Sequence, residues 1–469
     1  MEDLVGRGKE LAYLSNVYDK APVSCAVCGR RHLGKTAVIR EFCRDKHYIY
    51  VSGMIGLSSD NLREISKEFT SFAGSRVDLE DVADFFPWLK KICGKKKVVV
   101  VIDNYSDLVD NFPEFTSYMR QFINRDLPFT RMMLIVCDND SSVFGRFYYT
   151  LDIRAMSYRD CIGFHPDYTP LQHLIAYSVV GGTPAYQHLF QGDPGEAIRT
   201  HFFGHMAVFL LEIESMLGSE PIARLNSTKV LAAIASGAET LNDIAERANL
   251  RSAVARDAIE DMENKGMVRR EVSPTKRTVY SIHSNILRFY FTIVARYQPR
   301  VAFMSGNDAY EMAKADIDRY LESMFEHVCV DYVNYAFRCD GVGKPRKKDN
   351  SPDEIVNFVA VVDENRVKRS MFATCRMYGD KFGKGDLEDL KERSKAIKGS
   401  NRLYVMFSAA GFSVDLRDIA SKDPNVRLVS LEDMYARSQD KGKGFGRGQR
   451  PLCAIVSPRR TLCRWGFRR

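Results

Sequence analysis

The stretch Val23-Ser24-Cys25-Ala26-Val27-Cys28-Gly29-Arg30-Arg31-His32-Leu33-Gly34-Lys35-Thr36 decides how the rest of the sequence is interpreted. Its first six residues are largely apolar, which is typical of a buried strand, and the run from Ala37 to Phe42 after it predicts a helix. Between them lies the spacing G-x-x-x-x-G-K-[ST], which is typical of a loop that binds phosphate. Glycines let such a loop turn tightly so that its N–H groups face phosphate oxygens, and the next helix adds its positive N-terminus. The stretch therefore predicts an α/β domain with a nucleotide site.

The residues of this loop are the first candidates for contacts with a nucleotide. They are Gly29, Arg30, Arg31, His32, Leu33, Gly34, Lys35, Thr36 and Ala37. Lys35 is expected to reach the β and γ phosphates, and the Thr36 hydroxyl is expected to ligate Mg²⁺. Arg30 and Arg31 could supply further positive charge to the nucleotide or to a neighbouring subunit. The expected ligands are ATP and Mg²⁺.

A second buried strand, Val98 to Ile102, ends in Asp103, which is the expected second magnesium residue. The next residue is Asn104, where a hydrolytic enzyme of this kind usually has the Glu that orients the attacking water. An amide can hydrogen-bond water but cannot accept its proton, so the sequence predicts binding with slow hydrolysis. Asp107 or Asp110 on the following turn is the alternative base.

A third strand, Met132 to Cys137, ends in a polar segment that contains Asn139. Polar groups at the end of such a strand lie near the phosphates when the strands are parallel, and Asn139 is the expected γ-phosphate sensor. Asp103, Asn104 and Asn139 are therefore the candidate catalytic residues.

Four segments in order resemble one family. These are Val5-Gly6-Arg7-Gly8-Lys9-Glu10-Leu11, the phosphate loop, the Asp103 strand and Gly181-Gly182-Thr183-Pro184-Ala185-Tyr186. Together they are similar to the prokaryotic "archaeal ATPase" family, which belongs with the AAA+ and STAND-type P-loop NTPases, over most of the chain to about residue 430. The resemblance implies that Arg7 and Leu11 lie beside the adenine. It also implies that Gly181 to Tyr186 belongs to a helical lid.

The segment from Ser227 to Ile282 has the order of a winged helix-turn-helix. Helical periodicity starts at Ser227, Thr240 begins a second helix as its cap, and a third helix, Ser252 to Lys265, precedes two short alternating strands. The third helix is slightly acidic, and only the hairpin is basic, through Arg269, Arg270, Lys276 and Arg277. Because phosphate contacts dominate DNA affinity, the acidic third helix favours docking to a protein over sequence-specific binding of DNA.

The family continues with a domain similar to restriction endonucleases, whose metal site needs an Asp on one strand and Glu-x-Lys on the next. The matching strands are expected over residues 355–361 and 371–376, where Asn357, Thr374 and Arg376 take the positions of the metal site, and only Glu326 on the preceding helix keeps a carboxylate. Nuclease activity is therefore not expected. The basic loop Lys344 to Lys348 is either ordinary surface or a contact for a phosphate backbone.

Composition excludes several classes of protein. At 469 residues with 45% hydrophobic and 27% charged residues, the chain is long and apolar enough for two to four folded domains. Its longest aliphatic run is far short of a membrane span, and it begins with Met1-Glu2-Asp3 instead of a basic leader, so a cytoplasmic protein is expected. Eleven scattered cysteines indicate reduced thiols, and Cys25 and Cys28 are expected to face opposite sides of their strand.

The net charge of +8 comes from the end of the chain. Residues 441–469 contain nine Lys or Arg and no acid, which leaves −1 for residues 1–440. Such a Gly/Arg-rich basic tail is typical of a disordered end, and attraction to nucleic acid is the alternative interpretation.

The predicted fold is α/β, a P-loop NTPase parallel sheet with a helical lid, followed by a winged helix and a smaller nuclease-like α/β domain. The expected boundaries are 1–160 for the ATPase core, 161–224 for the lid, 225–285 for the winged helix, 286–435 for the degenerate nuclease-like domain and 436–469 for the basic tail.

The expected function is an ATP-dependent switch that presents its C-terminal half to a protein partner. The alternative is a DNA-binding regulator or nuclease-derived DNA binder. A remnant of a decaying gene is a third interpretation, which the intact phosphate loop opposes. Non-specific nucleic acid binding and an oligomer are compatible with the sequence, and no membrane partner is expected.

Overall fold

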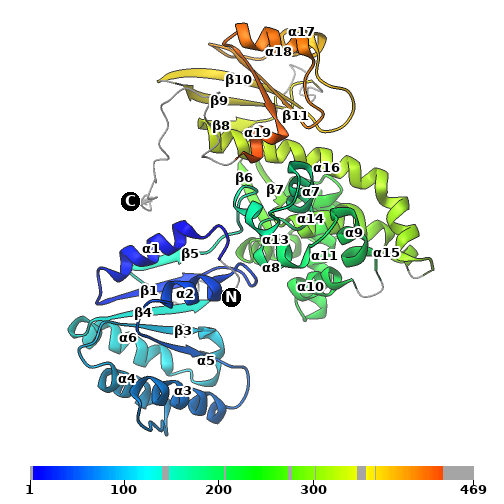
Figure 1. Cartoon of the computed structure of the whole chain (residues 1–469). Coiled ribbons are helices and arrows are strands. Elements are labelled where there is room, and N and C mark those ends of the chain that lie inside the picture. The colour runs from blue at the N-terminus through cyan, green and yellow to red at the C-terminus, as the bar shows by residue number, and fades with distance from the viewer. Residues whose placement is uncertain are drawn as a thin grey trace, which may run out of the picture.

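The computed structural model describes residues 4–139, 147–204, 207–272, 277–301, 303–345, 355–364 and 366–436. Two bodies with separate hydrophobic cores are visible in Figure 1. We call residues 4–153 the N-terminal domain and residues 158–436 the C-terminal body. The basic tail beyond residue 436, residues 346–348 of the basic loop and Lys276 of the hairpin lie outside the described residues.

The N-terminal domain is built on a five-stranded sheet of order β2-β3-β4-β1-β5, in which every pair of neighbours is parallel. The strands are β1 (Val23–Cys28), β2 (Tyr48–Ser52), β3 (Val98–Asp103), β4 (Met132–Asp138) and β5 (Tyr149–Asp152). Every residue of β3 and β4 is buried, as expected of strands covered on both faces. This α/β fold with a parallel sheet confirms the fold class that the sequence predicts.

Helices cover both faces of this sheet (Figure 1). One face packs against α1 (Gly8–Tyr18) and α2 (Lys35–Cys43). The other face packs against α3 (Ser58–Ala73), α4 (Phe85–Cys93), α5 (Tyr105–Asn111) and α6 (Phe115–Arg125), with short turns η1 (Val82–Asp84) and η2 (Leu127–Phe129). Cys25 lies in the first of these cores and Cys28 in the second, so the two thiols face opposite sides of β1 as predicted.

The C-terminal body begins with helices. They are η4 (Asp160–Phe164), α7 (Pro170–Val180), α8 (Pro184–Leu189), α9 (Pro194–Ile198), η5 (Arg199–Phe203), α10 (Val208–Leu217), α11 (Pro221–Ala235), α12 (Leu241–Arg247) and α13 (Ser252–Asn264). We call α7 to α10 the lid helices. After α13 comes an antiparallel hairpin of β6 (Val268–Val272) and β7 (Thr278–Ile282). Thr240 caps α12 by accepting the Asp243 N–H, and α12, α13 and the hairpin lie where the sequence predicts them. α11 begins at Pro221 instead of Ser227, because the Glu220 side chain caps it there.

A second sheet follows four more helices. The helices are α14 (Asn285–Phe289), η6 (Tyr290–Val294), α15 (Ala295–Val301) and α16 (Gly306–Ala336). The sheet has the order β12-β11-β10-β9-β8, with strands β8 (Arg338–Gly343), β9 (Phe358–Glu364), β10 (Val367–Arg376), β11 (Leu403–Ser408) and β12 (Val426–Ser430). β8, β9 and β10 pair antiparallel, whereas β10, β11 and β12 pair parallel. One face packs on α16 and the other on α17 (Lys384–Ser394) and α18 (Val414–Lys422).

The strand expected over residues 355–361 begins three residues later, at Phe358. The reason is the Asn357 side chain, whose Oδ1 accepts the Cys375 N–H at 2.8 Å in place of a strand carbonyl. Asn357 therefore ends the ladder with its side chain, and β9 continues to Glu364.

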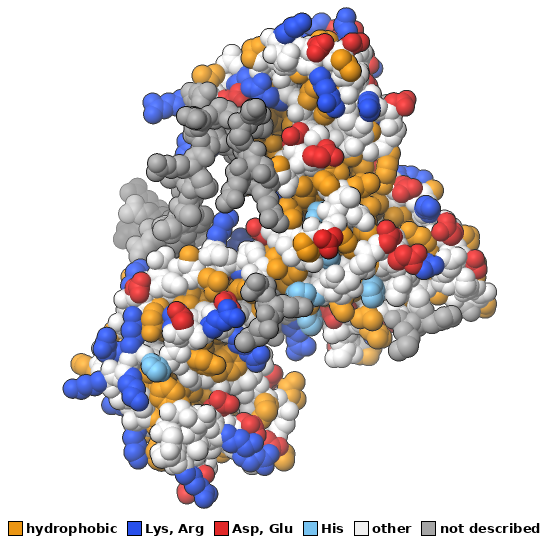
Figure 2. All heavy atoms as spheres, in the orientation of Figure 1, with side chains coloured by type: hydrophobic (Ala, Val, Ile, Leu, Met, Phe, Trp, Pro, Cys, Tyr) orange, Lys and Arg blue, Asp and Glu red, His pale blue; other side chains and the backbone are white. Residues whose placement is uncertain are grey.

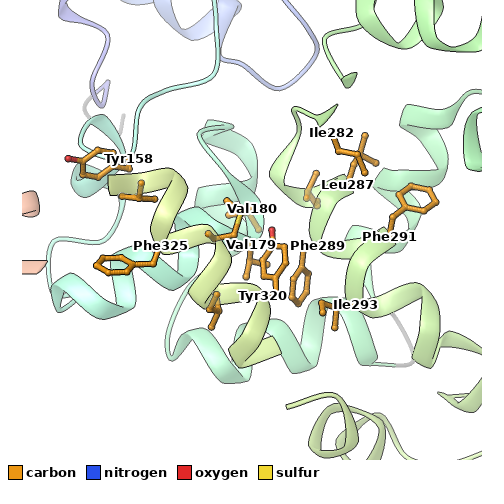
Figure 3. Packing of buried hydrophobic residues seen from close by; sticks show 14 of the residues in the cluster. Tyr158, Val179, Val180, Ile282, Leu287, Phe289, Phe291, Ile293, Tyr320 and Phe325 are labelled. Atoms are coloured by element: carbon orange, nitrogen blue, oxygen red, sulfur yellow. The ribbon is translucent and has the colours of Figure 1, made fainter. Parts of the chain in front are cut away.

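One continuous core joins the lid helices, the hairpin, α16 and the second sheet. Figure 3 shows part of it, with Val179 of α7, Ile282 of β7, Phe289 of α14 and Tyr320 of α16 packed together. The expected boundaries at 225 and 286 fall inside this cluster and stay predictions. No helix in the described ranges combines the length and apolar character needed to cross a membrane.

A short segment, residues 153–159, connects the two bodies. At one end the Ile153 N–H donates to the Cys28 carbonyl at 2.7 Å, directly before the phosphate loop. At the other end the Tyr158 hydroxyl donates to the Met434 carbonyl at 3.2 Å in the last helix, α19 (Leu431–Tyr435). The six residues from Ile153 to Tyr158 therefore connect a hydrogen bond beside the phosphate loop to a hydrogen bond in α19.

Candidate nucleotide site

The parallel sheet brings the predicted site residues together at one edge. The phosphate loop follows β1, Asp103 ends β3, and Asn139 follows β4, which lies between those two strands. The carboxyl ends of parallel strands meet at this edge, where such folds bind their ligands. The strand order therefore places Asn139 between the loop and Asp103.

Lys35 lies across its own loop and is 9% exposed. Its ammonium donates to the Gly29 carbonyl at 2.7 Å, to the Arg30 carbonyl at 3.1 Å and to Asn139 Oδ1 at 2.7 Å. An ammonium has three donors, so each has a partner. Burial lowers the pKa of Lys35, and the nearby Asp103 and Asp138 oppose this shift.

Asp103 and Thr36 meet beside Lys35. The Thr36 hydroxyl donates to Asp103 Oδ2 at 2.9 Å, and the Tyr50 hydroxyl of β2 donates to the same oxygen. Burial, together with the adjacent Asp103 carboxylate, raises the pKa of Tyr50. Hydroxyl and carboxylate oxygens are the ligands that Mg²⁺ takes in proteins, usually only one or two of them, with waters and substrate phosphates completing its shell. The Thr36 and Asp103 pair fits that requirement.

Asn104 has a left-handed backbone with φ of 50° and an exposed side chain. Its Nδ2 donates to the Ser52 hydroxyl at 3.1 Å, at the end of β2. The amide therefore lies at the same sheet edge as Asp103, and its side chain is held towards β2.

The neighbouring acids have different surroundings. Asp138 is buried and accepts both the N–H and the hydroxyl of Ser106 at 2.6 Å, which fixes the start of α5. Burial and the Asp138 carboxylate raise the pKa of Asp107, and Arg31 opposes this shift. Asp107 therefore belongs to the electrostatic environment of the site, whereas Asp138 acts on the position of a helix.

Arg7 is buried and is held by the loop itself. Its guanidinium donates to the Leu33 carbonyl at 2.7 Å, to the Arg154 carbonyl at 2.9 Å and to Glu10 at 2.8 Å. Arg7 thus fixes the backbone of the phosphate loop against the connecting segment. Leu11 is half-buried in the core that α1 and α2 share. The expectation that Arg7 and Leu11 lie beside a base stays a prediction.

The loop side chains Arg30 and His32 lie against the C-terminal body. A Cβ placed on Gly266, directly before β6, would lie 3.5 Å from Arg30 Cδ and 3.6 Å from its Nε. Burial lowers the pKa of Arg30, and Tyr186 opposes this shift. His32 has φ of 66°, and its Nε2 lies 3.4 Å from Glu212 Oε1 of α10. Arg31 is exposed.

Three groups around the site were not predicted from the sequence: Tyr50, Ser52 and Glu212. Tyr50 and Ser52 lie on β2, which is next to β3 in the sheet but about 50 positions away in the sequence. Glu212 belongs to a helix of the other body. No local motif marks such residues, because only the tertiary fold brings them to the loop.

Two of the positions expected to be a lost nuclease site, Asn357 and Glu326, lie together. Asn357 Nδ2 donates to Glu326 Oε2 at 3.1 Å, and the Lys344 ammonium lies 3.2 Å from Glu326 Oε1. Arg376 donates to Asp386 at 2.6 Å. The Glu326 carboxylate on α16 is thus already paired with a cation, and the described residues contain no cluster of three or more His, Cys, Asp or Glu suited to a metal.

The fold and the site together define a parallel α/β domain that brings a loop with the G-x-x-x-x-G-K-[ST] spacing, an acidic strand end and a polar third strand end to one edge of its sheet. The C-terminal body adds a second sheet to that domain.

Comparisons with known proteins gave distant similarities. No protein-family model matches the chain. The "Uncharacterized protein MJECL04" of Methanocaldococcus jannaschii is 22% identical over 357 residues, which cover 70% of this chain and 77% of that protein. Among solved structures, the Walker-type ATPase PABY2304 of Pyrococcus abyssi is 15% identical with a TM-score of 0.49, over 62% of this chain and 97% of that one. Cdc6p of Pyrobaculum aerophilum is 15% identical with a TM-score of 0.31, over 63% and 94% of the two chains.

Proposed function

We propose that this protein binds Mg²⁺-ATP in the loop Gly29 to Thr36 and acts as a nucleotide-dependent switch with slow hydrolysis. The observation that supports binding most strongly is the position of Lys35. Two of its three donors hold the loop's own carbonyls, and the third reaches Asn139 Oδ1. A phosphate oxygen that enters the loop takes the place of Asn139 on that third donor.

The loop needs little rearrangement to receive phosphate. Gly34 has φ of 87°, Lys35 begins α2, and the N-terminus of that helix adds favourable potential for an anion. Thr36 and Asp103 would hold Mg²⁺, which supplies charge neutralisation for the phosphates. Their side chains already lie in contact, so the ion would replace a hydrogen bond between them.

Slow hydrolysis is inferred from Asn104. Its amide is bonded to Ser52 and cannot accept a proton from water. Asp138 is engaged with Ser106, so Asp107 and Asp110 remain the alternative bases, and Asp107 lies in the electrostatic environment of the site.

The switch is inferred from the place where the two bodies meet. The side chains of Arg30 and His32 lie against the turn before the hairpin and against the lid helices. Residues 153–159 hydrogen-bond to Cys28 beside the loop at one end and to α19 at the other. Nucleotide in the loop would therefore set how firmly the C-terminal body is held. That body would present its surface to a protein partner in one nucleotide state and not in the other.

Calorimetric titration of Mg²⁺-ATP tests the binding. Lys35→Ala should weaken binding by about 100-fold or more, because it removes a charge-assisted contact in a buried site. Lys67→Ala, an exposed lysine on α3, is the matched control and should leave the affinity unchanged. Equal affinity of the wild type and Lys35→Ala for Mg²⁺-ATP would refute the proposed site.

The alternative, nucleic acid binding, has weaker support in the described residues. Arg269 and Arg270 of the hairpin are paired with Glu271 at 3.1 Å and Glu263 at 3.0 Å. On the face shown in Figure 2, basic and acidic side chains are interspersed over the described surface. DNA affinity measured against salt, with and without residues 441–469, distinguishes the two functions. A steep salt dependence that survives the deletion would favour DNA binding by the folded part.

A further inference from the structure

The contact between the phosphate loop and the lid helices has three members. His32 Nε2 lies 3.4 Å from Glu212 Oε1, and the Tyr186 hydroxyl donates to the same oxygen at 2.7 Å. The His32 and Tyr186 rings lie 6.0 Å apart at 41°. We call His32, Tyr186 and Glu212 the lid contact.

His32 has a backbone conformation that is uncommon for a residue other than glycine. Its φ of 66° is in the left-handed region, which a residue with a Cβ occupies at a cost. Gly34 and Gly29, the other loop residues with positive φ, are glycines. His32 therefore stores strain within the loop, and its side chain is the part of the residue that the lid helices hold.

The lid contact is part of a wider docking of the loop. A Cβ on Gly34 would lie 3.8 Å from Pro184 Cγ at the start of α8, and Arg30 lies beside Gly266. The loop thus has one side towards Lys35 and Asn139 and another side towards the C-terminal body. A change of loop conformation at Lys35 and Asn139 therefore also alters the contacts that the loop makes with the C-terminal body, or is opposed by them.

We propose that Glu212 and Tyr186 are positioning residues that hold His32, and with it the phosphate loop, in the conformation that accepts nucleotide. This inference rests on the proposed function and names how the C-terminal body regulates the same site. Coupling between two sites is reciprocal, so whatever moves the lid helices weakens nucleotide binding, and nucleotide strengthens the lid contact. A protein that docks on the C-terminal body can in this way control the nucleotide.

Four variants of the full chain test this, with the affinity for Mg²⁺-ATP measured by calorimetry. His32→Ala and Glu212→Ala should each weaken binding about five-fold, a typical size for coupling between sites. The double variant should be no weaker than the weaker single variant, because both remove one interaction. His32→Gly should lose less affinity than His32→Ala does, because glycine adopts the same φ without support.

Two further measurements separate positioning from a loss of structure. Glu212→Gln keeps an oxygen that accepts the Tyr186 hydroxyl, so it should recover most of the affinity that Glu212→Ala loses. Glu214→Ala, an exposed glutamate on the same helix, is the matched control. Thermal unfolding without nucleotide should show the same Tm for Glu212→Ala and Glu214→Ala.

The outcomes are distinct from those for the proposed function. If Mg²⁺-ATP binds to wild type and not to Lys35→Ala, but Glu212→Ala and His32→Ala keep wild-type affinity, the lid contact has no positioning role. Additive losses in the double variant, or a loss in His32→Gly equal to that in His32→Ala, would also overturn the inference. If the wild type binds no nucleotide, the proposed function and this inference both fail.

Discussion

Asn104 follows Asp103 with a left-handed backbone, and this conformation limits which residues can replace it. Asn adopts positive φ more readily than most residues, whereas Glu does so at a cost of about 1 kcal/mol. A catalytic Glu at this position would therefore supply a base and would also strain the left-handed backbone. The residue present has low strain and no base.

Asn104→Glu should raise steady-state ATP turnover and lower stability by about 1 kcal/mol, because it supplies a carboxylate for the water at the expense of backbone strain. Phosphate release measures the first effect and denaturant unfolding the second. Asn104→Gln is the control, with similar size and no charge. An unchanged rate in Asn104→Glu beside fast turnover in the wild type would place the base elsewhere, with Asp107 as the first residue to replace.

At the residue scale, the sequence predicts the groups that follow a buried strand. Lys35 contacts Asn139 and Thr36 contacts Asp103 at one sheet edge, because parallel strands end there and the spacing motif fixes the loop. Tyr50 could not be predicted, because its contact with Asp103 depends on β2 being the neighbour of β3. The roles of Arg7 and Leu11 beside a base stay predictions.

At the scale of elements, the sharp bend before α8 depends on Gly182. A Cβ at this position would lie 1.9 Å from the Met156 carbonyl oxygen and 2.6 Å from the Met156 nitrogen, both of them backbone atoms. The Met156 N–H also donates to the Gly182 carbonyl at 2.8 Å. The Gly181 to Tyr186 motif thus fixes the lid helices to the connecting segment by close backbone approach.

Gly182→Ala should destabilise the protein by about 2–3 kcal/mol, because the backbone on both sides has to move apart. Calorimetric Tm is the measurement, and Gly385→Ala in α17, where a Cβ meets nothing within 4 Å, should leave Tm unchanged or slightly raised. A Tm for Gly182→Ala equal to that of the control would show that the connecting segment is not packed as described.

The last helix, α19, docks on the lid helices through aromatic rings. His173 of α7 stacks on Tyr435 with ring centroids 5.6 Å apart, and His165 and Tyr168 lie 6.5 Å and 5.6 Å from His173. Burial, with the neighbouring His165, lowers the pKa of His173 to about 4. The folded protein therefore keeps this imidazole neutral at a pH where the unfolded chain protonates it.

The free energy of unfolding should therefore decrease as the pH is lowered. Above the ordinary histidine pKa of about 6.5 both states are neutral and His173 has no effect. Between about 6.5 and 4 the unfolded state binds a proton that the folded state refuses, which costs up to about 3 kcal/mol. His173→Gln should flatten this part of the stability curve, measured by urea unfolding from pH 7.5 to 4.5. The exposed His47→Gln should not, and equal pH slopes for the two variants would contradict the assignment.

Element positions were predicted most closely where caps and buried runs mark them, as at Thr240 and in β3. The start of β9 was missed by three residues, because the Asn357 side chain replaces a strand hydrogen bond, which no periodicity shows. The order of strands in the second sheet could not be predicted from local sequence patterns either, because it depends on which strands meet in space.

At the scale of the whole molecule, the phosphate loop lies where the two bodies meet (Figure 1). One core unites the lid helices, the hairpin, α16 and the second sheet, and the domain boundaries expected after residue 160 stay predictions. Such a union could not be predicted from composition, because every segment has its own apolar face and only packing shows which faces meet. A single C-terminal body can respond to the loop as a unit.

The central claim is that nucleotide in the loop strengthens its hold on the C-terminal body. Hydrogen exchange of the full chain, with and without saturating Mg²⁺-ATP, tests it most directly, in wild type and in Lys35→Ala. The account predicts slower exchange with nucleotide in the loop Gly29 to Gly34 and in α8 and α10 of wild type, and no change in Lys35→Ala. Protection of the loop alone, with α8 and α10 unchanged in wild type, would contradict it.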